Sequence, residues 1–86
     1  MQILTGERQM ILCGHTASFR QLCRTQVHEG DSVVDVGCSI GVSTHICHQS
    51  GATAVGIDIS KAVLTQARAS YPGIEYAPRT TLVRAD

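Results

Sequence analysis

The sequence predicts an α/β fold with part of a doubly wound parallel sheet, built as strand, helix, strand, helix, strand after an N-terminal helix. Two short runs, 32–36 and 53–57, are rich in β-branched and small apolar residues, as buried parallel strands are. Segments with apolar residues at helical spacing precede, separate and follow these runs. Strands and helices alternate in this way in βαβ units, so the chain holds about half of such a sheet.

The N-terminal segment has the weakest pattern. Residues 1–15 are compatible with a β-hairpin or an irregular lead-in, and we assign them as a lead-in to a domain over 16–86. A helix is expected to begin near Thr16, with Thr16 or Ser18 as its N-cap, and to end at Gly30. Its apolar stripe, at positions i, i+3, i+4 and i+8, consists of Phe19, Leu22, Cys23 and Val27.

The period of the apolar residues changes after this helix. The run 32–36 predicts a buried strand, and the small residues of 37–41 predict a turn directly after it. Residues 42–50 then predict a helix. The second strand is expected over 53–57 and is followed at once by Asp58.

The last predicted units are a helix and the start of a third strand. Ser60 is a suitable N-cap for a helix that continues to Tyr71. The third strand is expected to begin at 74–76, to be interrupted by Pro78 and to resume at 81–83.

Composition excludes several classes of function. Seven basic residues balance seven acidic ones, and the aromatic residues are one Phe and two Tyr, so the sequence lacks the features of a nucleic-acid-binding module. The longest apolar run, 10–13, is far too short to cross a membrane. The N-terminal residues do not resemble a secretory signal. We therefore expect a cytoplasmic protein that binds neither membranes nor nucleic acids.

The cysteines and histidines give little indication of a metal site. No Cys-x-x-Cys pair is present, and a closed zinc site needs about four ligands. His45 and His48 share a helix face, and Cys47 lies beside them. The simpler interpretation is that Cys13 and Cys23 are small buried apolar residues and that the histidines lie on a helix surface. We expect no metal and no disulfide framework.

The segment from the first strand to the second carries the functional signal. A glycine-rich turn, 37–41, joins a buried strand to the N-terminus of a helix, where backbone N–H groups are free to meet a ligand. About 20 residues later Asp58 follows the second strand, where a carboxylate can accept hydrogen bonds from ribose hydroxyls. The pattern predicts a ligand with an adenosine-like ribose.

Two common templates fit this turn poorly. The dinucleotide fingerprint G-x-G-x-x-G, placed on Gly37, requires glycine where Ser39 and Val42 stand, and Asp35 would repel a pyrophosphate. The template G-x-S-x-G matches 37–41 and would make Ser39 a nucleophile. In that fold, however, the acid and the histidine follow after further strands.

A third template fits both ends of the segment. Residues 35–41, Asp-Val-Gly-Cys-Ser-Ile-Gly, resemble the first motif of class I S-adenosylmethionine-dependent methyltransferases, D/E-x-G-x-G-x-G, with Ser39 in place of the middle glycine. Residues 56–60, Gly-Ile-Asp-Ile-Ser, resemble the second motif of that family at the expected distance. The resemblance covers roughly residues 18–76, and the combination of both motifs is what makes it specific.

The resemblance implies a Rossmann-like fold, of which this chain is the N-terminal part, and S-adenosyl-L-methionine as cofactor. The cofactor carries a sulfonium and an ammonium group and no phosphate, so Asp35 beneath the turn is compatible with it. Asp58 would hold the ribose, and Ile59 would pack on the adenine. If residues 77–80 belong to an insertion, Asp86 would be the acidic residue that binds the adenine amine; the alternative is that the tail is out of register or foreign. The cofactor residues implied are Asp35, Gly37, Cys38, Ser39, Gly41, Asp58, Ile59 and Asp86.

The catalytic groups are not implied by this sequence. In the resembled family the residues that hold and deprotonate the methyl acceptor usually follow the later strands, so no catalytic base is named and the chain alone is not expected to be active. A small-molecule acceptor is the default expectation. One alternative is a truncated or degenerate Rossmann-like module without catalysis that acts as a binding domain. Its open sheet edge could pair with a second copy of the chain or with a completing chain. A lesser alternative is a fragment of an NAD-binding oxidoreductase.

Overall fold

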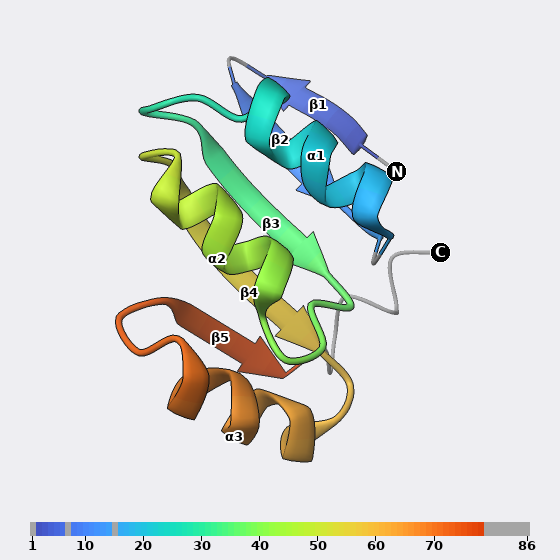
Figure 1. The fold of residues 1–86 in the computed structure, drawn as a ribbon, viewed down its shortest axis with the longest axis vertical. Coiled ribbons are helices and arrows are strands. Elements are labelled where there is room, and N and C mark those ends of the chain that lie inside the picture. Colours follow the sequence, from blue (N-terminus) through green and yellow to red (C-terminus); the bar gives the residue numbers. More distant parts are fainter. Residues whose placement is uncertain (1, 7, 15, 79–86) are drawn as a thin grey trace.

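The computed structural model describes residues 2–6, 8–14 and 16–78, and these form an α/β unit (Figure 1). The sheet within these residues has five strands in the order β1-β2-β3-β4-β5. β1 and β2 are antiparallel, whereas β2, β3, β4 and β5 are parallel to one another. The elements are β1 (Gln2–Gly6), β2 (Gln9–Leu12), α1 (Ala17–Gln26), β3 (Ser32–Val36), α2 (Val42–Gln49), β4 (Thr53–Asp58), α3 (Lys61–Ser70) and β5 (Glu75–Pro78).

Each helix connects two neighbouring parallel strands, and the three helices cover the same face of the sheet (Figure 1). Helices that follow right-handed crossovers between strands added in one direction must share a face. α1 and α2 pack on β2, β3 and β4, and α3 packs on β4 and β5. The buried apolar side chains under α1 and α2 are Met10, Leu12, Phe19, Cys23, Val27, Val33, Ile46, Cys47, Ala52 and Ala54.

The opposite face of the sheet bears a row of β-branched side chains that no described helix covers. Ile11, Val34 and Val55 are aligned across β2, β3 and β4 by the strand register. Val34 and Val55 are half-buried, and Ile11 is exposed. Among the described residues, no helix is long and apolar enough to span a membrane.

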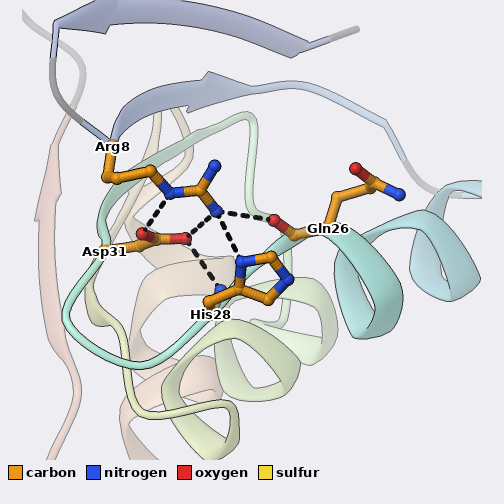
Figure 2. Close-up of polar contacts among 4 residues, drawn as sticks. All are labelled: Arg8, Gln26, His28 and Asp31. Carbon is orange, nitrogen blue, oxygen red and sulfur yellow. Dashed lines mark hydrogen bonds and ion pairs between the residues drawn. The ribbon is translucent and has the colours of Figure 1, made fainter.

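The N-terminal hairpin is tied to the rest of the sheet by an arginine at its turn. Arg8 donates from Nε and Nη2 to the two carboxylate oxygens of the buried Asp31, at 2.7 Å each (Figure 2). The same Nη2 lies 2.9 Å from His28 Nδ1 and donates to the Gln26 carbonyl at 3.1 Å. The ion pair with Arg8 and a hydrogen bond from the His28 N–H lower the pKa of Asp31.

The structure confirms the predicted fold class, a partial Rossmann-like sheet, and extends its parallel part. The strand expected over 32–36 is present, and the helix and strand that follow it lie within one residue of their expected positions. Residues 1–15 were left open between a hairpin and a lead-in, and the structure shows a hairpin. Its second strand pairs in parallel with β3, so the sheet has four parallel strands where the sequence indicated three.

Three local predictions were wrong. The first helix ends at Gln26, not at Gly30, because the Gln26 carbonyl and the His28 N–H are engaged by Arg8 and Asp31. Leu22 is 38% exposed, although its spacing placed it on the buried stripe. Pro78 does not interrupt the third strand but is the last residue of β5, where an edge strand tolerates the missing N–H. The continuation expected over 81–83 lies outside the described residues.

Candidate functional site

The turn between β3 and α2 has an unusual backbone. Its three alternate residues Gly37, Ser39 and Gly41 have φ values of 70°, 54° and 92°. This left-handed region is open to glycine and costs other residues about 1–2 kcal/mol. The positions at which the methyltransferase motif carries glycine are therefore the positions at which this turn requires positive φ, and Ser39 adopts the conformation at some cost.

The turn is held against the end of β4 by its own N–H groups. The backbone nitrogens of Gly37 and Cys38 donate to the Ile57 carbonyl at 2.8 and 2.9 Å. The Ser39 N–H donates to Asp58 Oδ2 at 2.9 Å. These bonds bring the turn and the carboxyl end of β4 together, at the edge where ligands bind in open α/β sheets.

Asp58 is fixed between two backbone segments. One carboxylate oxygen accepts from Ser39, and the other accepts from the Ser60 N–H at 2.9 Å, just before α3 begins. Asp58 remains half-buried, and an ionised carboxylate has about four lone-pair sites. Its two oxygens can therefore accept further hydrogen bonds from a ligand at this edge.

Asp35 lies beneath the turn on the helix-covered face of the sheet. It is only 1% exposed, and its Oδ2 accepts a hydrogen bond from the Thr44 hydroxyl at 2.7 Å. This bond connects the end of β3 to the first turns of α2. An ionised carboxylate at this position favours a cationic group on any ligand bound at the turn and disfavours a phosphate.

Gly56 makes room for the side chains packed under the turn. A Cβ atom at Gly56 would lie 2.8 Å from Tyr76 Cδ1, 2.9 Å from Cys38 Sγ and 3.0 Å from Thr44 Oγ1. Burial raises the pKa of Cys38 to about 12, with further contributions from the charges of Asp35 and Asp58. Burial likewise raises the pKa of Tyr76 to about 12. Both groups are therefore neutral near pH 7, so neither is a nucleophile or a base there.

A hollow of about 270 Å³ adjoins the turn. Its walls come from the turn, the first turn of α2 and one arginine of α1, namely Arg20, Cys38, Ser39, Ile40, Val42 and Ser43. Arg20 was not identified from the sequence. Its position next to Phe19 and one turn before Cys23, both buried, was a usable signal that it lies at the border of the buried stripe.

The structure brings most of the predicted cofactor residues together. Asp35, the turn residues 37–41 and Asp58 lie at the carboxyl ends of β3 and β4. Ile59 follows Asp58 with 72% of its surface exposed, as a residue available to a ligand would be. Asp86 lies outside the described residues. The roles of these residues stay predictions.

Of the cysteines, Cys38 belongs to the turn, whereas the His45 ring and the thiols of Cys23 and Cys47 are engaged elsewhere. The His45 ring stacks on Tyr71 with 4.3 Å between ring centroids. Cys23 and Cys47 are buried free thiols at the contact of α1 with α2. Cys13 is exposed, so the expectation that it is buried was wrong. In the described part of the chain, no three His, Cys, Asp or Glu side chains are grouped closely enough to hold a metal ion.

Comparison with family models identifies the family of this chain. The model of a family described as a methyltransferase domain matches residues 34–86. The match contains Asp35, the turn 37–41 and Asp58, and it covers more than half of the 86 residues. No curated protein matches the chain.

Proposed function

The chain belongs to the methyltransferase-domain family, and from this premise we propose that it binds S-adenosyl-L-methionine as the cofactor-binding portion of an enzyme that methylates a small-molecule acceptor. The observation that carries the proposal is the hydrogen bond from Ser39 N–H to Asp58. It connects the turn with three positive φ angles to the carboxylate that follows the next strand.

The described residues fit the chemical groups of this cofactor. Asp58 has acceptor capacity left for the two ribose hydroxyls, and the exposed Ile59 beside it offers an apolar surface to the adenine. The buried carboxylate of Asp35 favours the sulfonium and ammonium groups. A pyrophosphate would meet the same negative charge, which supports S-adenosylmethionine over a dinucleotide.

The contribution of this chain to methyl transfer is binding and orientation. The bound cofactor supplies the activated methyl group, and the fixed backbone of turn 37–41 sets where that group is presented. Three described side chains near the turn are poorly suited to act as a base. Cys38 and Tyr76 are protonated near pH 7, and the His45 ring is stacked on Tyr71. We therefore propose no catalytic base among the described residues.

A calorimetric titration with S-adenosylhomocysteine tests the proposal, with NAD as the control ligand and circular dichroism on the same sample. We expect the folded chain to bind S-adenosylhomocysteine and not NAD. Preferential binding of NAD would favour the dinucleotide interpretation. A folded chain that binds neither ligand would contradict the proposed function.

A further inference from the structure

Two buried thiols meet where α1 packs against α2 (Figure 1). Cys23 of α1 is 2% exposed and Cys47 of α2 is 0% exposed, and both are free thiols in the apolar cluster under these helices. Their side chains share a hydrogen bond. The pair has no part in the proposed binding of the cofactor, so what it does can be tested separately from that function.

The shared hydrogen bond makes the two thiols chemically unequal. The Cys47 thiol donates to the Cys23 sulfur, and this bond lowers the pKa of Cys23. The same bond, together with burial, raises the pKa of Cys47. The thiolate is the nucleophilic form of cysteine, so Cys23 is the member of the pair that attacks an oxidant. Cys47 keeps its proton and lies in contact with the sulfur that would be oxidised.

The remaining cysteines are placed differently. The Cys38 thiol donates to the Ser39 carbonyl at 3.6 Å, and burial raises the pKa of Cys38 to about 12. Cys13 follows β2 directly and is exposed, so its thiol can react with other molecules. An internal disulfide is therefore expected between Cys23 and Cys47 and not through Cys38.

We propose that a small peroxide converts Cys23 and Cys47 into a reversible disulfide that cross-links α1 to α2. The Cys23 thiolate attacks one oxygen of hydrogen peroxide, the O–O bond breaks, and a sulfenic acid forms. The released hydroxide takes up the proton that Cys23 lost and leaves as water. The Cys47 sulfur then attacks the Cys23 sulfur, the S–O bond breaks, and the Cys47 proton leaves with a second water. The two sulfurs lose two electrons, and the peroxide oxygens gain them.

The cross-link encloses the turn that the proposed function assigns to the cofactor. Residues 24–46, between the two cysteines, contain β3 and the turn 37–41. A disulfide that closes a loop of this length restricts the unfolded chain and so stabilises the folded one. We expect the oxidised chain to melt about 10 °C above the reduced chain.

Oxidation of the Cys13→Ser chain tests the proposal without the exposed thiol. The folded chain is treated with hydrogen peroxide, its remaining thiols are alkylated in urea, and mass spectrometry counts them. We expect two of the three thiols to be lost, the mass to fall by two hydrogens, and dithiothreitol to restore both thiols. Trypsin cuts after Arg20 and Arg24, so peptide 21–24 should be found linked to the peptide that holds Cys47. Because both sulfurs are buried, their oxidation should be slower than that of Cys13 in the wild type.

Matched variants identify the sulfur atoms. Cys13→Ser combined with Cys38→Ala should still form the disulfide, and Cys13→Ser combined with Cys23→Ala should not. The tryptic map of the Cys38→Ala variant identifies the linkage by itself if the Cys23→Ala variant does not fold. Peroxide treatment in urea should give mixed linkages, because unfolding separates α1 from α2.

Three results would overturn the proposal. The first is a folded chain that keeps its buried thiols after prolonged treatment with peroxide that oxidises Cys13 in the wild type. The second is a disulfide through Cys38, or the addition of oxygen to single thiols without a disulfide. The third is an oxidised chain that melts no higher than the reduced one in circular dichroism, which would refute the stabilising cross-link. None of these results bears on cofactor binding.

Discussion

Replacement of Asp58 by Asn tests the proposed ribose contact with a change of one atom in the side chain. In the structure the two carboxylate oxygens accept from Ser39 N–H and Ser60 N–H, both at 2.9 Å. An Asn side chain offers one oxygen and one NH₂ group, so only one of these two N–H groups keeps its acceptor. The variant also loses the negative charge to which the ribose hydroxyls would donate.

The expected magnitudes follow from these bonds. A hydrogen bond to a charged group contributes about 1.5–3 kcal/mol, and a neutral one about 0.5–1.5 kcal/mol. Two ribose hydroxyls that lose a charged acceptor should therefore cost about 2–4 kcal/mol of binding free energy, which raises Kd about 30- to 900-fold. The N–H that loses its acceptor should lower the free energy of unfolding by about 1–2 kcal/mol.

Calorimetric titration of S-adenosylhomocysteine measures the first effect, and urea unfolding followed by circular dichroism measures the second. Glu75→Gln is a matched control, because it removes the same charge at the exposed start of β5, away from the carboxyl ends of the strands. Its affinity should equal that of the wild type. An Asp58→Asn variant that is folded and binds with unchanged affinity would refute the ribose assignment.

Three further predictions concern the stability of the fold. Gly56→Ala should lower the free energy of unfolding by about 1–3 kcal/mol, because its Cβ would overlap three side chains. Urea unfolding measures this change. An unchanged free energy would show that the three side chains move aside at little cost. Ser39→Gly should raise that free energy by up to about 1 kcal/mol and keep cofactor affinity, and a loss of affinity would contradict the interpretation of Ser39 as a substitute for glycine. The lowered pKa of Asp31 stabilises the fold above the ordinary carboxyl pKa of 3.8, and this stabilisation is lost as the pH falls towards the lowered value. Thermal melts of Arg8→Gln should therefore show a weaker pH dependence in this acid range, and an unchanged dependence would argue against the ion pair.

The elements that could be predicted are those specified by short-range signals. The β-branched residues of β3 and the cap at Ser60 act through neighbouring residues, so both can be recognised in the sequence without the tertiary structure. The end of α1 could not be predicted from neighbouring residues, because Asp31 and Arg8 form hydrogen bonds with the backbone groups that would otherwise continue the helix. The hairpin could not be distinguished from a lead-in, because a two-stranded unit gains its stability from pairing with β3.

The sequence by itself determined the turn and the carboxylate after the second strand, and it predicted the class of ligand. Glycines spaced closely in a turn indicate a backbone with positive φ, and the carboxyl ends of neighbouring parallel strands must meet at one edge. Only the tertiary structure decided that Gly56 packs against Tyr76 and that Arg20 lines the hollow beside Ser39. These contacts join residues about 20 positions apart. They depend on which face of the sheet α1 covers and on the order of the strands, and the spacing of neighbouring residues does not encode either.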